Sequence, residues 1–165
     1  MGLVFLVVTF ILLIVGGVFL IRNIKANHVP DAVLSGVEVY AQEQKFTPEL
    51  RVAISYAIEV CKVRCAKFGF KTDLEPWRLN LYLEPARYRA HFGSVEIAMQ
   101  ANSLPTVGDL YIGVQASLET TASLVCHELA HHIYWRNTYD RQTLHDNRGF
   151  WEAVDQPMKM GEVYR

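Results

Sequence analysis

The sequence lacks an excess of charge of either sign, and it has few cysteines. Its 165 residues include 16 Lys and Arg against 17 Asp and Glu, a formal net charge of −1. A nucleic-acid-binding domain normally carries a clear basic excess, so no nucleic acid is expected as a partner. The three cysteines form an odd set, which argues against the disulfide framework of a small secreted domain. We expect Cys61 and Cys65, four residues apart on a predicted helix, to be small buried hydrophobes.

The first 21 residues contain no charged side chain. From Gly2 to Ile21, 16 of 20 residues are hydrophobic. A helix of that length rises about 30 Å, which is the thickness of the hydrocarbon layer of a bilayer. No Lys or Arg precedes the run and no small-residue cleavage site follows it, which disfavours a cleavable signal peptide. The pattern predicts a transmembrane anchor at residues 1–22, with the lipid bilayer as a partner through residues 2–21.

Basic residues flank this apolar run on one side only. Arg22 and Lys25 follow it, and only the α-amino group precedes it. Positive charges near a span favour the cytoplasmic side of the membrane. The sequence therefore predicts a single-pass membrane protein whose globular domain is cytoplasmic.

Apolar periodicity divides the rest of the chain into helices and strands. Residues 23–46 are mixed in character and are interpreted as a linker, in which 37–40 adds a short strand. Helices are predicted at 47–69, 117–136 and 147–155, from their caps and their apolar steps of three and four residues. Alternation with period two predicts strands at 77–84, 95–100 and 110–115, and residues 85–92 are interpreted as a short helical or irregular excursion. The fold class is α+β in residues 47–165, with helices on one face of a small three-stranded sheet.

The second predicted helix contains His127-Glu128-Leu129-Ala130-His131. Residues four apart lie on one helix face, so both imidazoles can converge on one zinc ion at about 2.0–2.1 Å. Glu128 lies about 100° round the helix, where it can reach a water molecule and serve as general base. The motif predicts Zn²⁺ as cofactor, His127 and His131 as ligands, and Glu128 as the catalytic residue. The alternative is a histidine-rich amphipathic helix without metal.

A catalytic zinc site needs a third protein ligand, and three downstream residues qualify. His145 follows His131 by 14 residues, Asp146 is next to it, and Glu152 lies inside the last predicted helix. Neutral imidazole is a common ligand of catalytic zinc, which favours His145. Asp146 is an alternative ligand, or an outer carboxylate that holds a ligand histidine. Glu152 is the other alternative.

The two motifs together resemble those of the SprT-like and YgjP-like zinc metallopeptidases, whose catalytic core is a minimal gluzincin-like (zincin-like) one. The resemblance rests on His127-Glu128-Leu129-Ala130-His131 and on His145-Asp146-Asn147-Arg148-Gly149-Phe150-Trp151, and it covers roughly residues 120–156. It implies a zinc peptidase with His145 as third ligand. The spacing departs from the family pattern, because His145 stands five residues before Phe150, and Asp146 occupies the family position. Glu152 with Asp155 is similar to the ligand Glu and trailing Asp of thermolysin-like enzymes.

These observations favour a membrane-anchored zinc metallopeptidase that acts on a protein or peptide. An extended substrate is expected to pair with an exposed strand edge next to the active helix. The predicted edge strand is Leu110, Tyr111, Ile112, Gly113 and Val114. Two other functions stay open: a zinc-dependent hydrolase of a small amide, and a non-enzymatic, membrane-tethered domain for metal binding or interaction.

Overall fold

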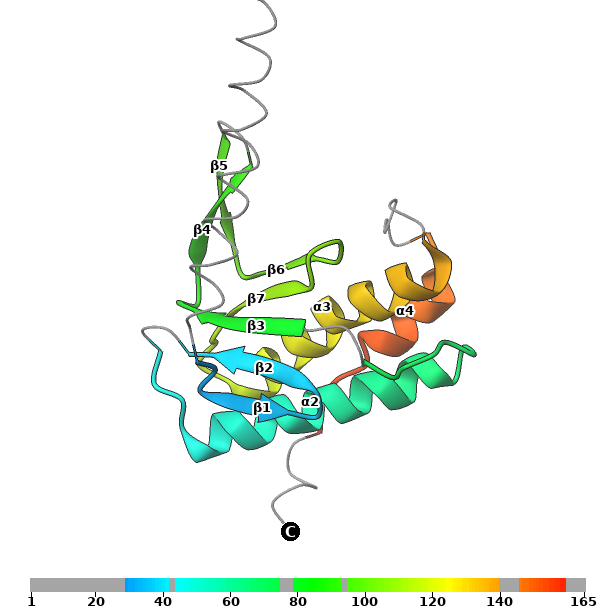
Figure 1. The fold of residues 1–165 in the computed structure, drawn as a ribbon, viewed down its shortest axis with the longest axis horizontal. Helices are drawn as coiled ribbons and strands as arrows, with labels where there is room; N and C mark the ends of the chain where they lie inside the picture. The colour runs from blue at the N-terminus through cyan, green and yellow to red at the C-terminus, as the bar shows by residue number, and fades with distance from the viewer. Residues whose placement is uncertain (1–28, 42–43, 75–78, 93–94, 140–145, 160–165) are drawn as a thin grey trace, which may run out of the picture. The chain divides into compact units, whose positions relative to one another are not determined.

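A mixed five-stranded sheet is the frame on which the other elements pack in the computed structural model (Figure 1), which describes residues 29–41, 44–74, 79–92, 95–139 and 146–159. The strand order is β1-β2-β3-β7-β6. The central strands β2, β3 and β7 are parallel, and the outer strands β1 and β6 each pair antiparallel with their neighbour. The strands are β1 (Ala32–Leu34), β2 (Val37–Tyr40), β3 (Leu79–Glu84), β6 (Ala101–Leu104) and β7 (Asp109–Gly113).

Two further strands form a hairpin that extends from this sheet. β4 (Tyr88–Phe92) pairs antiparallel with β5 (Val95–Met99), and neither belongs to the five-stranded sheet. Figure 1 shows the hairpin projecting beyond the end of the main sheet. β5 leads directly into β6, so the hairpin and the outermost strand of the main sheet are continuous in sequence.

The helices begin at polar capping residues. α2 (Pro48–Ala66) starts after Thr47, whose hydroxyl accepts a hydrogen bond from the Leu50 N–H at 3.2 Å. α3 (Leu118–Thr138) starts after Ser117, which caps the Thr120 N–H in the same way. α4 (Arg148–Val154) starts after Asn147. Each cap satisfies a backbone donor that the first turn of a helix leaves without an internal partner.

The core lies between the sheet and the helices. Leu79, Leu81 and Leu83 of β3 are buried, whereas the alternate residues of that strand face the other side and are half-buried. Leu110 and Ile112 of β7 extend the buried set, which packs on Ile54, Ile58, Val125 and Leu129 of α2 and α3. The period of two along the strands thus assigns one sheet face to the helices, and this confirms the predicted α+β class with helices on one face.

The predicted three-stranded sheet has the wrong number of strands and includes one strand that belongs to the hairpin. The strand predicted at 95–100 pairs with β4 outside the main sheet, and β4 lies wholly within residues 85–92, which were interpreted as an excursion. β1 and β6, which stand at the two edges of the described sheet, were not predicted. β2 (Val37–Tyr40) confirms the short strand predicted at 37–40 within the linker. Local alternation identifies a strand but not its partner, because pairing depends on residues distant in sequence.

The predicted transmembrane helix and single-pass membrane localisation need correction. None of the helices in the described ranges has both the length and the apolar character needed to cross a bilayer. α2 has 19 residues but carries Glu49, Arg51, Glu59, Lys62 and Arg64, so its apolar residues form a stripe and not a lipid-facing surface. The segment predicted as the anchor, residues 1–22, lies outside the described residues.

Candidate metal centre

The two motif histidines face one another on α3. The Nε2 atoms of His127 and His131 are 3.2 Å apart, and the ring centroids are 4.9 Å apart. Two Zn–N bonds of about 2.05 Å that meet at about the tetrahedral angle place their nitrogens about 3.3 Å apart. The Nε2 atoms therefore have the separation that two ligands of one zinc ion require. In metal-free protein the same separation fits a hydrogen bond between one protonated and one unprotonated nitrogen.

A carboxylate at the end of α4 fixes the tautomer of His127. Oδ1 of Asp155 lies 2.7 Å from Nδ1 of His127, a distance typical of a charge-assisted hydrogen bond. When Nδ1–H donates to Asp155, the lone pair of Nε2 is left on the side that faces His131. Carboxylates that hold the second nitrogen of a metal-binding histidine orient the ring and raise its basicity. The sequence indicates Asp155 only as the acidic residue that follows Glu152 at a thermolysin-like spacing.

Aromatic packing holds α4 against α3 at this point. Phe150 is fully buried, and its ring lies 5.3–5.4 Å from the rings of Phe68, Phe70 and Tyr134. The next residue, Trp151, places its ring 4.4 Å from that of His131 and 5.2 Å from that of His127. The pair Phe150-Trp151 thus anchors α4 in the core and limits the rotation of both imidazoles.

Glu128 lies between the two histidines in sequence and is buried, with 8% of its surface exposed. Burial raises the pKa of its carboxyl group, although the nearby His127 and the Ser103 hydroxyl act in the opposite direction. A raised pKa moves a carboxyl group toward the range in which it can accept and return a proton near neutral pH. Ser103 belongs to β6, so Glu128 faces the outermost strand of the sheet.

An open hollow of about 340 Å³ adjoins His127 and is bounded on the other side by α4. Arg148, Trp151, Glu152 and Asp155 line it from one face of that short helix. Glu152 accepts a hydrogen bond from Arg148, with Nε and Oε1 2.6 Å apart, and its side chain is 62% exposed. Glu152 therefore shares the hollow with one motif histidine.

The third ligand stays a prediction. His145 lies outside the described residues, and Asp146 is exposed just before α4. Among the residues that the structure describes, no group of three or more His, Cys, Asp and Glu is placed to hold one metal ion. The structure brings His127, His131 and Asp155 together, and it places Glu152 beside them.

The predicted substrate edge at residues 110–114 is wrong. Leu110, Tyr111, Ile112 and Gly113 belong to β7, which pairs with β3 on one side and with β6 on the other. The Val114 N–H donates to the Glu84 carbonyl at 2.9 Å. Within the described chain, the edge of the sheet that contacts α3 is β6, which has a strand neighbour on one side only. This strand is short (Ala101–Leu104), and its two polar and two apolar residues do not alternate.

His132, which follows the motif, and the three cysteines are buried in the core. His132 is 1% exposed, and its Nε2 lies 3.3 Å from the Asp109 carbonyl oxygen. Burial lowers the pKa of His132 to about 4, so it is neutral near pH 7. Cys61, Cys65 and Cys126 are free and buried, which confirms that Cys61 and Cys65 are small core residues.

The chain was compared with known proteins at three levels. No family model, curated protein sequence or solved structure matches it. The function is therefore inferred from the residues of this chain and their geometry.

Proposed function

We propose that the protein is a zinc-dependent metallopeptidase with a zincin-like site resembling that of the SprT-like and YgjP-like enzymes. The arrangement of His127, His131 and Asp155 supports the proposal most strongly. Two Nε2 atoms stand 3.2 Å apart, and a carboxylate 2.7 Å behind His127 holds the tautomer that a metal ligand needs. A histidine-rich helix without a metal role does not require this carboxylate.

The catalytic role belongs to Glu128. A bound zinc ion supplies a Lewis acid that polarises a carbonyl group and lowers the pKa of water. Glu128 takes the proton from the attacking water and returns it to the leaving amine. Its burial and its raised pKa favour both transfers over a permanently ionised state. Asp155 and Trp151 keep the imidazole rings in place while Glu128 exchanges the proton.

The open side of β6 favours a peptide substrate over a small amide. An extended peptide can add to the edge of a sheet through main-chain hydrogen bonds. Ser103, in the middle of β6, lies beside Glu128, so a strand bound to this edge passes next to the base. A small amide gains nothing from such an edge.

For the third ligand we propose His145, with Asp146 as an outer carboxylate and Glu152 as the alternative ligand. A histidine completes a set of three imidazoles, which is a common set in catalytic zinc sites. The ion pair of Glu152 with Arg148 occupies one of its carboxylate oxygens, and this argues against Glu152 as the ligand.

The test compares metal content and cleavage in two variants of one helix. Glu128→Gln removes the base and keeps the shape, so zinc content measured by elemental analysis should stay near one ion per chain. Cleavage of an unfolded protein should fall by about 10²–10⁴-fold, as expected for the loss of positioned acid–base catalysis. The control is Glu119→Gln, the same change at an exposed position of α3, which should leave cleavage unchanged. Full activity of Glu128→Gln, or a wild type that neither binds zinc nor cleaves peptides, would refute the proposal.

A further inference from the structure

The carbonyl groups at the end of α4 are bound by an arginine from a different helix. Nη1 of Arg64 on α2 lies 2.6 Å from the Val154 carbonyl oxygen and 2.8 Å from that of Gln156. Nη2 of Arg64 lies 3.4 Å from the Pro157 carbonyl oxygen. A guanidinium group carries five N–H donors in a fixed fork, so one side chain can donate to all three carbonyls. These carbonyls stand on both sides of Asp155 in the chain.

The position of α4 is set by its contacts with the rest of the fold. It has seven residues, and an isolated helix of that length is not stable in water. Phe150 and Trp151 hold its first turns in the core. Two acidic residues, Glu152 and Asp155, stand at its C-terminal end, where the unpaired carbonyl groups of a helix make negative charge unfavourable. α4 has no basic residue in its last turn, and Arg64 supplies that positive charge from α2.

The Val154 carbonyl has a second contact, which comes from α3. Sγ of Cys126 lies 3.8 Å from this oxygen, as in a weak S–H hydrogen bond. Cys126 directly precedes His127 in α3, and Val154 directly precedes Asp155. One carbonyl oxygen therefore joins α2, α3 and α4, one residue away from both partners of the Asp155–His127 contact.

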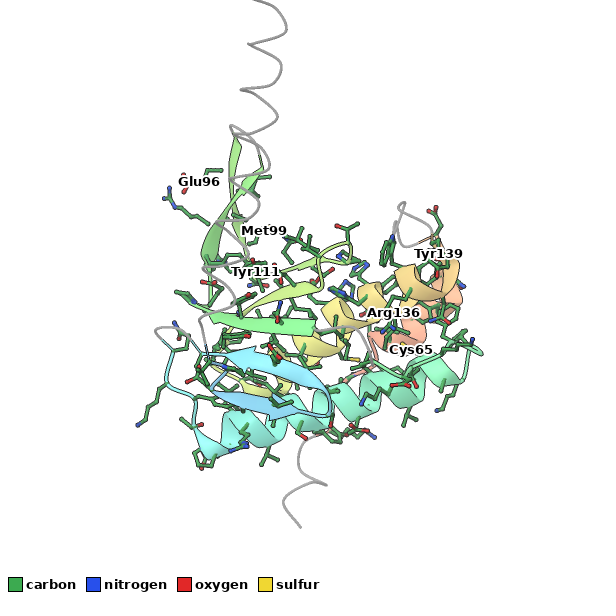
Figure 2. The ribbon with its side chains drawn as sticks, viewed as in Figure 1. Cys65, Glu96, Met99, Tyr111, Arg136 and Tyr139 are labelled. Atoms are coloured by element: carbon green, nitrogen blue, oxygen red, sulfur yellow. The ribbon has the colours of Figure 1, made fainter. Side chains whose placement is uncertain are left out.

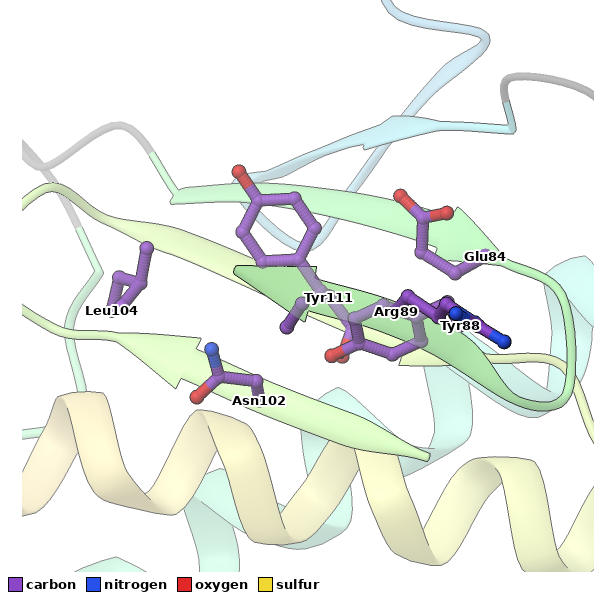
Figure 3. A pocket seen from close by; sticks show the side chains of 7 residues that line it. Glu84, Tyr88, Arg89, Asn102, Leu104 and Tyr111 are labelled. Carbon is purple, nitrogen blue, oxygen red and sulfur yellow. The ribbon is translucent and has the colours of Figure 1, made fainter. Parts of the chain in front are cut away.

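Two other arginines of the described chain make contacts of a different kind. Arg89 lines a second hollow, of about 360 Å³ (Figure 3), and its Nη1 lies 2.9 Å from Oε2 of Glu96. Arg148 is bound to Glu152 within α4. The side chains of these two arginines are 75% and 89% exposed, and exposed ion pairs contribute little to stability. Arg64 is instead half-buried, and its two shorter contacts have the length of charge-assisted hydrogen bonds to the main chain.

The contact of Asp155 with His127 depends on where the main chain of Asp155 lies. Aspartate has a short side chain, so its carboxylate follows any movement of its backbone. Oδ1 of Asp155 is 2.7 Å from Nδ1 of His127, and an N–H···O hydrogen bond weakens beyond about 3.2 Å. A shift of the end of α4 by about 1 Å away from His127 would therefore break this bond. Because Arg64 binds the carbonyls before and after Asp155, it restricts such a shift.

We propose that Arg64 is a positioning residue of the metal centre, which holds the main chain around Asp155 so that the Asp155 carboxylate keeps His127 in the tautomer that binds metal through Nε2. Arg64 acts through the main chain and not on the metal ion. The proposal rests on the proposed metal centre, since that centre gives the His127 tautomer its role. It adds α2, a helix without any of the motif residues, to the elements that determine zinc affinity.

The first test observes His127 directly in the zinc-free full chain. Long-range ¹H–¹⁵N NMR correlations of the imidazole rings, recorded well above the usual histidine pKa of about 6.5, distinguish the Nδ1–H tautomer from the Nε2–H tautomer. The signals of His127 are identified by their absence in His127→Gln. The wild type should show the Nδ1–H tautomer, since Asp155 accepts from Nδ1. Arg64→Gln should increase the fraction of the Nε2–H tautomer, as Asp155→Ala should.

The second test measures zinc affinity by competition with a chromophoric chelator. Arg64→Gln should lower the affinity by about 3–10-fold, less than Asp155→Ala, because the carboxylate remains and is in place for part of the time. In the Asp155→Ala background, Arg64→Gln should have no further effect, whereas a merely structural role would lower the affinity in both backgrounds. Arg64→Lys keeps the charge but lacks the planar fork, so its affinity should lie between those of the wild type and Arg64→Gln. If Arg64→Gln does not fold, Arg64→Lys is judged by the same criteria.

The matched control is Arg136→Gln on α3 (Figure 2). Nη1 of Arg136 donates to the Asp73 carbonyl at 3.2 Å, so this change also removes a contact between an arginine and a carbonyl, but one that does not involve α4. It should leave the His127 tautomer and the zinc affinity unchanged. An unchanged tautomer in Arg64→Gln, or equal losses of affinity with and without Asp155, overturns the positioning role even if the protein is a zinc peptidase. A tautomer change in Arg64→Gln in a protein that binds no zinc supports the positioning of His127 and refutes the peptidase.

Discussion

Replacing Asp155 tests whether the His127 tautomer is set by its carboxylate. Asp155→Ala removes the acceptor that lies 2.7 Å from Nδ1 of His127, and Asp155→Asn keeps an acceptor oxygen but removes the charge. Substitutions of such outer partners typically lower metal affinity by about 10–100-fold, or roughly 1.4–2.7 kcal/mol. We expect the alanine variant near the upper end of that range and the asparagine variant near the lower end.

The assay is competition for zinc with a chromophoric chelator at fixed pH and ionic strength. The Asp155 side chain is 50% exposed, and the backbone N–H of Asp155, not its carboxylate, closes the last turn of α4. The free energy of unfolding of zinc-free protein should therefore change by less than about 0.5 kcal/mol. This measurement separates lost metal affinity from lost stability.

A double-mutant cycle with His127→Ala decides how Asp155 acts. If Asp155 works only through His127, Asp155→Ala should have no further effect on zinc affinity once His127 is replaced. Wild-type affinity in the alanine variant, or a full additional loss in the His127→Ala background, would refute the reasoning and remove the main support for the metal centre.

The remaining predictions concern the third ligand, the pH dependence of stability and one close contact. His145→Ala should lower zinc affinity severely, Asp146→Ala by roughly 10–100-fold and Glu152→Ala less, and zinc loss only in Glu152→Ala would reverse this order. As the pH falls below 6.5, His132 becomes protonated in the unfolded chain, but in the folded chain it stays neutral until the pH reaches about 4. Metal-free protein should therefore lose about 3 kcal/mol of stability as the pH falls between these values. Denaturant titrations across that window give the change of the free energy of unfolding with pH. This change should be smaller in His132→Gln, which retains an N–H donor, and an equal change in both proteins would contradict the assignment of the loss to His132. Gly113→Ala should lower the free energy of unfolding by about 1–3 kcal/mol, because its Cβ meets carbonyl oxygens at 2.8 Å, whereas Gly149→Ala, with nothing within 4 Å, should not destabilise.

Local signals in the sequence predicted the helices well. Thr47 and Ser117 cap α2 and α3 as expected, and the alternation that begins before β3 assigns Leu79, Leu81 and Leu83 to the core. These features depend on residues a few positions apart, whose spacing determines which face they share. They could therefore be predicted without knowledge of the rest of the fold.

Strand pairing and the carboxylate behind His127 depend on distant residues. β6 is four residues long with no buried alternation, and its place at the end of the sheet is set by its pairing with β7. The contact of His127 with Asp155 joins positions 28 apart, and it forms because Phe150 and Trp151 hold α4 against α3. In the sequence, only the spacing of Glu152 and Asp155 indicates a role for Asp155 near the motif.

Ser103 connects the sheet to the candidate metal centre. It belongs to β6, an edge strand of the described sheet, and its hydroxyl lies beside the carboxyl group of Glu128 on α3. Because side chains on a strand alternate strictly, the pairing of β6 with β7 determines that Ser103, and not its neighbours in the strand, faces Glu128. A shift of this pairing by one residue would remove the Ser103 hydroxyl from the surroundings of Glu128. These surroundings therefore depend on strand pairing as well as on the helix that carries the motif.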